Sequence, residues 1–375
     1  MRVLVTGGAG FIGSHTAEAL LARGYDVRVL DALQPRVHPQ GWPRYFVPEI
    51  ERLEGDVRDP ATWRHALEGV RVVYHLAAYQ DYMPDFSTFF AVNTVSTGLL
   101  YETIVARHLP VEKIILASSQ AVYGEGKYRC PSHGTLYPGP RPLDQLAAGT
   151  WEVLCPQCRQ PLAPLPIDEA TVNPHTAYGI SKHALEMAGF ALGRRYGIPT
   201  IALRYSIVQG PRNSFNNAYS GVCRIFSLRL LNGRPPVIYE DGRQQRDYVH
   251  IADVVQANLL VLDRGEADFE AFNVGGQRAV TVLEMARLVA EACGRDLPPE
   301  VRGAYRVGDT RHTVSSSEKL GRLDWRPEIP VEQIVQDYVA WVREQPEARD
   351  VTGVAIGQME KAGVVRQARP SAVGL

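Results

Sequence analysis

A glycine-rich turn near the start of the chain limits its possible fold more than any other feature. Residues 2–6 form a short apolar run, and the turn Gly7-Gly-Ala-Gly10-Phe11-Ile12-Gly13 leads from it into a helical pattern over residues 14–23. Glycines at this spacing let a helix pack closely on a strand and let the backbone approach a phosphate, while the helix N-terminus attracts the anion. The order strand, turn and helix therefore predicts the first unit of a doubly wound α/β sheet with a phosphate-containing ligand.

An acidic residue closes the second predicted strand. The apolar run at residues 27–30 ends in Asp31. In a dinucleotide-binding unit, a carboxylate at this position accepts hydrogen bonds from the adenosine ribose, and its charge would repel a 2′-phosphate. The pattern therefore favours NAD over NADP as the ligand.

Apolar runs and helical patterns continue to alternate along the first half of the chain. Further strands are predicted before Asp56-Val57 and within residues 70–78 and 113–119. Such alternation predicts a Rossmann-type, doubly wound parallel sheet with its ligands at the carboxyl ends of the strands. We expect Asp56 to meet the adenine, although strand-end solvation explains it equally well. We also expect a cofactor cleft lined by Ala77, Ala78 and Asn93, for which strand-end solvation or helix capping is the alternative.

A tyrosine and a lysine share one helical face in Tyr178-Gly-Ile-Ser-Lys182. We expect the Lys182 ammonium to lie near the Tyr178 hydroxyl and to lower its pKa below the ordinary value of about 10. Ser119 ends the strand at residues 113–119, where its hydroxyl would bind a substrate alcohol. Together these residues predict an acid-base unit. The alternatives are an ordinary amphipathic helix and a serine that only caps its strand.

A stretch rich in proline and glycine, residues 125–167, interrupts the alternation. It contains Cys130-Pro-Ser-His133 and Cys155-Pro-Gln-Cys158, a spacing typical of a tetrahedral structural zinc site with a Cys3His ligand set. Such a metal would fold a loop that is too poor in apolar residues to order itself. Because protein ligands fill all four positions, we expect no catalysis by this metal. Unrelated thiols and a Cys155/Cys158 redox pair are the alternatives.

The pattern predicts a large first domain and a smaller second lobe. Residues 1–208, with 125–167 inserted, correspond to the dinucleotide-binding domain, residues 209–343 mainly to a substrate-binding lobe, and residues 344–375 to a loosely docked tail without clear periodicity. The second half carries three arginines that are suited to clamp a diphosphate, with surface ion pairs as the alternative. They are Arg212, Arg246 and Arg306. Helices are predicted in this half at residues 222–231, 252–263, 281–293 and 331–343.

The composition argues against several classes of function. Among 375 residues, 40 Lys and Arg face 41 Asp and Glu, so the formal charge of −1 offers no field for nucleic acid or an anionic membrane. No uninterrupted apolar run approaches the roughly 20 residues that span a bilayer, and the N-terminus does not resemble a signal peptide. We therefore expect a cytoplasmic protein whose five cysteines are reduced thiols or metal ligands.

With these residues identified, the chain resembles the extended short-chain dehydrogenases/reductases that act on nucleotide sugars. Four signatures occur in order over residues 1–343: Thr-Gly-Gly-Ala-Gly-Phe-Ile-Gly from Thr6, Ser-Ser-x-x-Val-Tyr-Gly from Ser118, the pair Tyr178 and Lys182, and Arg-Asp-Tyr-Val-His from Arg246. The resemblance implies that Ser119, Tyr178 and Lys182 are catalytic. The substrate-binding residues that it implies are Ser119, Asn217, Arg246 and Arg306. The cofactor-binding residues that it implies are Gly7, Gly10, Phe11, Ile12, Gly13, Asp31, Asp56, Val57, Leu76, Ala77, Ala78, Asn93, Tyr178 and Lys182.

Departures from the family pattern indicate the reaction. Nucleotide-sugar 4,6-dehydratases carry Asp-Glu directly after the catalytic hydroxyl residue, where this chain has Gln120-Ala121. The resemblance therefore implies a 4-epimerase, which oxidises C4 of the sugar to a transient ketone and reduces it again on the other face with catalytic NAD. The family's Phe-Asn at the nicotinamide pocket is replaced by Ser206-Ile207.

Within the epimerases, the similarity is to enzymes that act on dTDP-L-rhamnose. It is carried by the zinc-like insert and by residues 216–221, 232–236 and 240–242. Two alternatives stay open: a nucleotide-sugar dehydrogenase or 4-keto-sugar reductase, and a non-catalytic NAD-binding scaffold whose insert binds a protein. The resemblance also implies a homodimer formed through the helices near Asn93 and Tyr178.

Overall fold

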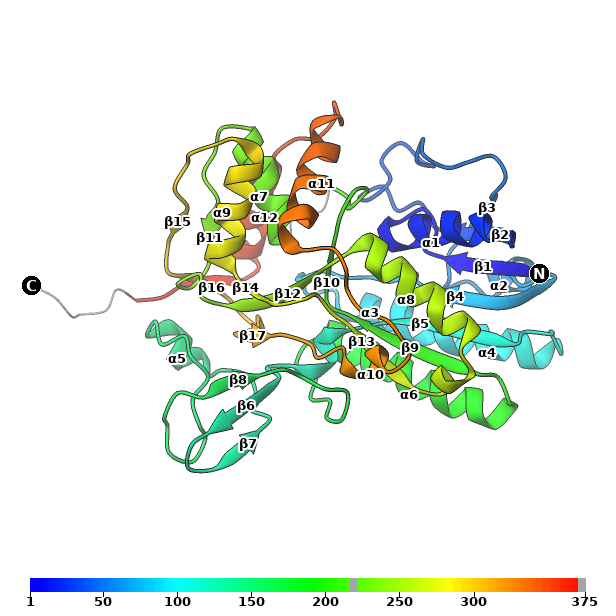
Figure 1. Ribbon diagram of the computed structural model, residues 1–375, viewed down its shortest axis with the longest axis horizontal. Helices are drawn as coiled ribbons and strands as arrows, with labels where there is room; N and C mark the ends of the chain where they lie inside the picture. Colours follow the sequence, from blue (N-terminus) through cyan, green and yellow to red (C-terminus); the bar gives the residue numbers. More distant parts are fainter. Residues whose placement is uncertain (216–220, 370–375) are drawn as a thin grey trace, which may run out of the picture.

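A parallel sheet of seven strands forms the centre of the computed structural model, which describes residues 1–215 and 221–369 (Figure 1). Its central strands are rich in Val, Ile and Leu and are buried on both faces, as expected for a sheet covered by helices on each side. Their order in space is β13-β9-β5-β4-β1-β2-β3, and every neighbouring pair is parallel. The strands are β1 (Arg2–Thr6), β2 (Asp26–Asp31), β3 (Glu51–Glu54), β4 (Val70–His75), β5 (Lys113–Ser119), β9 (Thr200–Tyr205) and β13 (Ala271–Val274).

Helices cover both faces of this sheet and confirm the predicted Rossmann-type architecture. Two of them pack together on one face, and the others lie against the opposite face. The first group is α1 (Phe11–Ala22) and α8 (Ile251–Asp263). The second group is α2 (Pro60–Ala66), α4 (Ser96–Ala106), which continues α3 (Phe86–Phe89) and the π-helical turn η1 (Phe90–Val95), and α6 (Ala177–Tyr196). Because all strands are parallel, the turns that follow β1, β4 and β5 meet at one edge of the sheet.

The predicted insert forms a small unit beside the sheet. Its three strands are antiparallel in the order β7-β6-β8, and Figure 1 shows the unit projecting from the rest of the molecule. The elements are β6 (Lys127–Cys130), β7 (Gly134–Leu136), α5 (Leu143–Ala147) and β8 (Ala163–Leu165). A core of its own consists of Tyr128, Cys130, Val153, Cys155 and Leu162.

The second lobe combines a four-stranded sheet with three helices. β12 pairs in parallel with β10 and β17 and antiparallel with β14, while β11 pairs with β15. The elements are β10 (Ile207–Gln209), α7 (Val222–Leu231), β11 (Val237–Ile238), β12 (Gln245–His250), β14 (Ala279–Thr281), α9 (Val282–Cys293), β15 (Glu300–Val301), β17 (His312–Thr313) and α11 (Val331–Arg343). Since α8 and β13 return to the main sheet, residues 209–343 are shared between the two lobes.

The C-terminal segment packs on the second lobe, so the expectation of a loosely docked tail is wrong for residues 344–369. This segment contains α12 (Thr352–Lys361) and β18 (Val365–Gln367), and β18 pairs with β16 (Ala304–Arg306). Met359 and Val365 are buried against Ala304. The apolar residues here join a small cluster with residues from distant parts of the chain, and such contacts leave no periodicity in the sequence.

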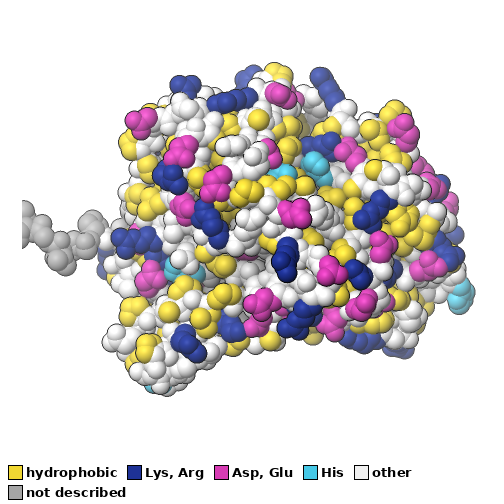
Figure 2. All heavy atoms as spheres, viewed as in Figure 1, with side chains coloured by type: hydrophobic (Ala, Val, Ile, Leu, Met, Phe, Trp, Pro, Cys, Tyr) yellow, Lys and Arg dark blue, Asp and Glu magenta, His cyan; other side chains and the backbone are white. Residues whose placement is uncertain are grey.

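Among the described residues, one helical stretch is long and apolar enough to cross a membrane when judged by length and composition alone. It is Phe86–Ala106, which comprises α3, η1 and α4. In the structure this stretch covers the sheet, with Leu100, Tyr101 and Ile104 buried in the core. On the face shown in Figure 2, positive and negative side chains are interspersed, in keeping with the formal charge of −1.

Candidate active site

The glycine-rich turn lies at the carboxyl end of β1 and packs closely against the backbone that follows β4 and against the start of α1. Gly7 has a φ of +67°, and a Cβ atom there would lie 2.8 Å from the Cα of Ala77. A Cβ atom at Gly13 would lie 2.2 Å from the carbonyl oxygen of Gly7, so only glycine lets α1 begin this close to the turn. No side chain caps α1 at its N-cap residue, Gly10. The glycine turn continues through Phe11 and Ile12 into a helix N-terminus that no side chain caps. This arrangement fits a pyrophosphate.

Asp31 ends β2 beside this turn. Its carboxylate accepts hydrogen bonds from the backbone N–H of Ala9 at 3.0 Å and of Leu33 at 2.9 Å. These bonds hold the side chain next to the turn, and burial raises its pKa. The carboxylate therefore lies where a ribose attached to a pyrophosphate on the turn would meet it.

Five further predicted cofactor residues lie at the same sheet edge. Asp56 follows β3 and pairs with Arg58 at 2.6 Å, which lowers the pKa of Asp56, while the next residue, Val57, is buried. Leu76, Ala77 and Ala78 follow β4, where the Ala77 N–H donates a hydrogen bond to the Thr6 hydroxyl at 3.1 Å. This bond joins the ends of β1 and β4 and so forms one wall beside the glycine turn.

Asn93 is buried in η1 and acts as a structural link. Its amide oxygen accepts a hydrogen bond from the Tyr79 N–H at 2.8 Å, and its amide nitrogen donates to the Tyr79 carbonyl at 3.0 Å and to the Ser181 hydroxyl at 2.9 Å. The side chain therefore fastens the segment after β4 to α6. Because these bonds occupy both ends of the amide, Asn93 orders the cleft wall through its neighbours.

The predicted acid-base residues come together at the carboxyl end of β5. Ser119 is the last residue of β5; its hydroxyl accepts a hydrogen bond from the Ala121 N–H at 3.1 Å and lies near enough to Tyr178 to affect the Tyr178 pKa. Tyr178 lies in the first turn of α6, which Thr176 caps by accepting the Gly179 N–H at 3.1 Å. One turn further along α6, Lys182 is buried and donates to the Ala117 carbonyl at 2.8 Å.

The electrostatics of Tyr178 differ from the sequence-based expectation. Burial raises the pKa of Tyr178 to about 12, and the nearby Ser119 hydroxyl only partly opposes this rise. Burial also lowers the pKa of Lys182 to about 7. The expected lowering of the Tyr178 pKa by Lys182 is therefore wrong for the chain alone. The Lys182 ammonium points to the Ala117 carbonyl and lies 5.9 Å from the centre of the Tyr178 ring.

Two of the predicted diphosphate-binding arginines meet at one carboxylate in the second lobe. Arg246 donates to Asp309 at 3.2 Å, and Arg306 lies 4.0 Å from the other oxygen of Asp309. The Arg306 guanidinium stacks on Tyr82 at 4.2 Å and on Tyr239 at 5.0 Å. Its buried Nε has no hydrogen-bond partner among the described residues, which leaves a donor for an anionic ligand.

The remaining predicted substrate residues are not part of this pair. Arg212 pairs with Glu18 of α1 at 2.9 Å and stacks on Tyr45 at 4.2 Å, so it belongs to the first domain. Asn217 lies outside the residues that the structure describes.

Tyr82 and Asp309 were not predicted from the sequence. Tyr82 stacks on the Arg306 guanidinium and also contributes to the raised pKa of Tyr178, so it stands between the acid-base pair and the arginines. Its place in the segment after β4, at the ligand-binding edge of a parallel sheet, is a signal that could have identified it. Asp309 lies in a loop without such a signal.

The four predicted metal ligands also come together. One donor atom from each of Cys130, His133, Cys155 and Cys158 lies within 4.8 Å of the others. The sulfurs of Cys130 and Cys158 are 3.7 Å apart, and His133 Nδ1 is 3.4 Å from the sulfurs of both Cys130 and Cys155. A tetrahedron with Zn–S bonds of about 2.3 Å has edges of about 3.8 Å, so this donor set fits zinc.

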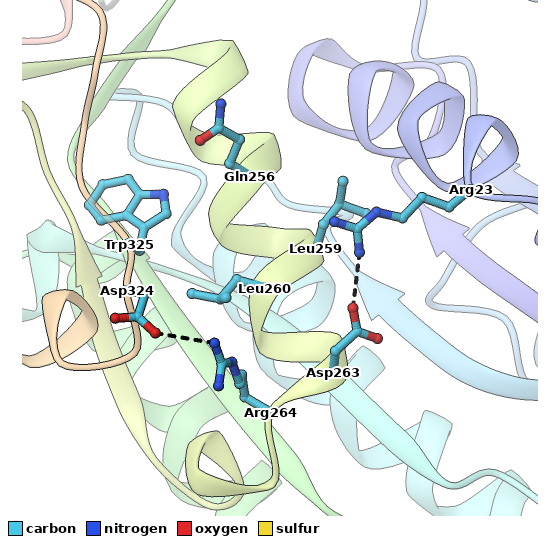
Figure 3. A pocket seen from close by; sticks show the side chains of 8 residues that line it. All are labelled: Arg23, Gln256, Leu259, Leu260, Asp263, Arg264, Asp324 and Trp325. Carbon is cyan, nitrogen blue, oxygen red and sulfur yellow. Dashed lines mark hydrogen bonds and ion pairs between the residues drawn. The ribbon is translucent and has the colours of Figure 1, made fainter.

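A separate surface depression, shown in Figure 3, contains none of the predicted site residues. It is lined by Arg23, Gln256, Leu259, Leu260, Asp263, Arg264, Asp324 and Trp325. Its charged groups pair with one another, Arg23 with Asp263 at 3.0 Å and Arg264 with Asp324 at 3.3 Å. This depression therefore offers little to a ligand.

Comparison with known proteins gives matches over most of the chain. The model of the NAD dependent epimerase/dehydratase family matches residues 3–144 and 146–275. A dTDP-L-rhamnose 4-epimerase of Burkholderia thailandensis is 34% identical over 351 residues, which cover 92% of this chain and 95% of that protein.

Solved structures show the same similarity. The UDP-glucose 4-epimerase of Thermotoga maritima with UDP-glucose superposes with a TM-score of 0.76 at 30% identity, covering 92% of this chain and 100% of that one. The UDP-glucose 4-epimerase of Thermus thermophilus in complex with NAD gives a TM-score of 0.72 at 31% identity, with coverage of 92% and 100%.

Proposed function

Because the chain belongs to the NAD-dependent epimerase/dehydratase family, we propose that it inverts C4 of a nucleotide-diphospho-sugar through a transient 4-keto intermediate, with NAD as cofactor. The observation that carries this proposal is the contact between Ser119 and Tyr178 beside Lys182, at the sheet edge that also holds the glycine turn. The similarity to 4-epimerases along most of the chain supports it.

Ser119 and Tyr178 handle the proton of the C4 hydroxyl. Ser119 orients this hydroxyl, and Tyr178 removes its proton during the oxidation and returns a proton during the reduction. Bound NAD supplies the hydride acceptor for the first half-reaction and the hydride donor for the second. In the chain alone the Lys182 ammonium points to the Ala117 carbonyl, and we propose that it stabilises the Tyr178 phenolate when NAD is bound.

The residues after Ser119 favour epimerisation over dehydration. Elimination of water from the sugar needs an acid and a base near C5 and C6, whereas Gln120 and Ala121 offer neither. The Ala121 N–H is also used to bind the Ser119 hydroxyl. A dehydrogenase or reductase of the same fold is the second candidate, because it would use the same Ser119, Tyr178 and Lys182.

For the substrate we propose a sugar linked to a nucleoside diphosphate, with dTDP-L-rhamnose as the first compound to test. Arg246 and Arg306 supply the positive charge for the diphosphate. The experiment is incubation of the purified protein with a panel of dTDP-, UDP- and GDP-sugars, followed by NMR of the C4 epimers. C4 inversion without added reduced cofactor supports an epimerase. Stoichiometric consumption of cofactor without inversion would identify a dehydrogenase or reductase.

We also propose that the Cys3His cluster holds a structural zinc ion. The separation of its donor atoms and the small core around Cys130 and Cys155 support this assignment. Metal analysis of the purified protein is expected to find one zinc per chain and none in Cys155→Ser. A folded wild-type protein without metal would contradict the assignment.

A homodimer is a further part of the proposal. Helices α3, η1 and α6 leave several large apolar side chains exposed on neighbouring turns, and a second copy of the chain would cover them. They are Phe86, Phe90, Val95, Ile180 and Met187. Light scattering is expected to give twice the chain mass, and Met187→Glu is expected to shift the protein towards the monomer.

A further inference from the structure

The insert contacts one segment of the second lobe, residues 305–316, at several points. The Trp151 and Tyr305 rings lie in a tilted arrangement with their centres 6.1 Å apart, and the Ile167 N–H donates to the Val314 carbonyl at 2.9 Å. Between these ends, Arg141 donates to the Asp309 carbonyl at 2.9 Å. The insert therefore follows this segment along its length.

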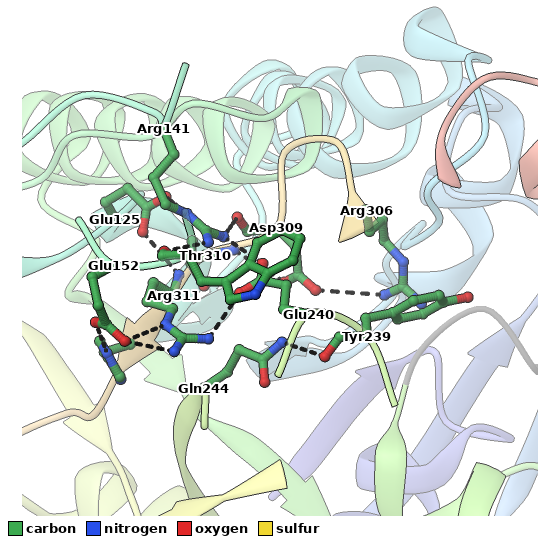
Figure 4. Close-up of polar contacts among 12 residues, drawn as sticks. Glu125, Arg141, Glu152, Tyr239, Glu240, Gln244, Arg306, Asp309, Thr310 and Arg311 are labelled. Atoms are coloured by element: carbon green, nitrogen blue, oxygen red, sulfur yellow. Dashed lines mark hydrogen bonds and ion pairs between the residues drawn. The ribbon is translucent and has the colours of Figure 1, made fainter. Parts of the chain in front are cut away.

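Arg311 is the centre of these contacts, as Figure 4 shows. Its guanidinium is 0% exposed and binds Glu152 of the insert at 2.6 Å and Asp241 of the second lobe at 2.7 Å. Glu240 also binds the Arg311 guanidinium, at 2.9 Å, and Glu125 accepts a hydrogen bond from the Arg311 backbone N–H at 2.9 Å. A fully buried guanidinium needs this many acceptors, so its position depends on carboxylates from both units.

Glu152 connects this network to the proposed metal site. It binds Arg311 through one oxygen, and through the other it accepts a hydrogen bond from His312 Nε2 at 3.1 Å. His312 Nδ1 accepts the Gln245 N–H at 3.2 Å, which leaves the proton on Nε2. Glu152 directly precedes Val153 of the insert core and lies close in sequence to the metal ligand Cys155, so the fold of the insert sets its position.

The segment that the insert holds also carries the proposed diphosphate clamp. Arg306 belongs to this segment. Arg246 donates to the Thr310 carbonyl at 2.6 Å and to the Arg311 carbonyl at 3.0 Å, so the segment fixes the direction of its guanidinium. Asp309 lies between the two arginines. A shift of this loop would therefore move both positive charges.

We propose that the insert is a positioning element for substrate binding: through Glu152 and Arg311 it holds residues 305–316 so that Arg246 and Arg306 are preorganised for a nucleoside diphosphate. This inference rests on the proposed function, because it takes these arginines as the diphosphate site. It assigns Glu152 a role in substrate affinity although Glu152 touches no reacting atom.

The test compares Glu152→Gln with the matched variant Glu291→Gln. Glu152 is 40% exposed, so the substitution leaves the insert core intact. Glu291 pairs with Arg287 at 2.5 Å on the exposed face of α9 and has no contact with residues 305–316 among those described. For each variant, calorimetry with dTDP and with UDP gives Kd, kinetics give kcat and KM, and thermal unfolding and NAD binding report on the rest of the fold.

Glu152→Gln is expected to raise the Kd for the nucleoside diphosphate and the KM about tenfold, with kcat and NAD affinity unchanged and with Tm lowered by no more than about 2 °C. Glu291→Gln is expected to change none of these values. An unchanged Kd in Glu152→Gln overturns the inference, and so does a parallel loss of NAD affinity and Tm, which would show a general structural role. A wild type that binds neither dTDP nor UDP overturns it as well. A wild type that binds dTDP but does not invert C4 contradicts the proposed function alone.

Discussion

Two regions of the molecule position their functional residues in different ways. One is the sheet edge that carries Tyr178, and the other is the junction between the insert and the second lobe. At the sheet edge, Ser119 ends a strand and Tyr178 begins a helix, so local backbone geometry positions them. At the junction, Arg311 binds Glu152 and Asp241, which come from distant parts of the chain. The first region depends on local structure, and the second depends on long-range pairing of buried charges.

This difference determines how each region should respond to substitution. Removing a reacting group at the sheet edge removes chemistry with little effect on folding. Removing one charge at the junction leaves its partners buried and unpaired, which displaces the loop that they hold. We therefore expect effects on kcat from the sheet edge and effects on substrate affinity or stability from the junction.

The largest effect is expected for Tyr178→Phe, which removes the proposed base while keeping the ring. Because general acid-base catalysis contributes about 10²- to 10⁴-fold, kcat should fall by about 10³-fold, with NAD binding and Tm unchanged. Tyr196→Phe, at the exposed end of the same helix, is the matched control. Wild-type turnover in Tyr178→Phe would contradict the assignment of Tyr178 as the acid-base residue.

The second effect in size is expected for Arg306→Lys, which keeps the charge but loses the planar guanidinium between Tyr82 and Tyr239. The KM for the nucleotide sugar should rise about 10- to 100-fold, because a lysine offers no fork to a diphosphate. Steady-state kinetics measure this change, and kcat should stay within about threefold. Arg302→Lys, at an exposed position, is the control. An equal fall in kcat would show that Arg306 acts on the reaction itself.

These two regions also differ in how far the sequence reveals them. The glycine turn, Asp31, Ser119 and the Tyr178–Lys182 pair could be predicted because strand ends and helix starts have local patterns. The raised pKa of Tyr178 could not be predicted, since it follows from burial by the folded chain.

At the junction, the sequence predicts the metal ligands by their spacing, but it does not predict their neighbours. Glu152 and Arg311 are ordinary charged residues in the sequence, and only the fold brings them together. The C-terminal segment shows the same limit, because β18 is specified by its pairing with β16 and has no periodicity of its own.

Removal of the proposed zinc ion should have a smaller effect than the two substitutions above, and it should change the stability of the protein. A chelator is expected to lower the Tm of the wild type by about 5 °C, because the insert core is too small to order the loop by itself. Cys155→Ser should start at the lower Tm and show no further change with chelator. Equal sensitivity of both proteins to the chelator would show that the metal is bound elsewhere.

The smallest effect concerns pH. His312 and Arg311 lower the pKa of Glu152 to about 2, below its value of about 4.3 in the unfolded chain. The stability that this carboxylate contributes is therefore fully present above pH ~4.3 and is lost as the pH falls towards ~2. Because Glu152 is partly exposed, we expect urea unfolding to show a gap below about 1 kcal/mol between wild type and Glu152→Gln at pH 6. The gap should shrink at pH 3. A gap that is the same at both values would contradict the pairing.

The most direct test of the central claim follows the hydrogen at C4. The purified protein is incubated with a nucleotide sugar deuterated at C4, with dTDP-L-rhamnose as the first choice, and no reduced cofactor is added. A reversible oxidation at C4 predicts that the inverted product keeps its deuterium at C4 and that absorbance at 340 nm does not accumulate. Loss of deuterium to solvent, or release of a keto sugar with stoichiometric reduced cofactor, would contradict a 4-epimerase.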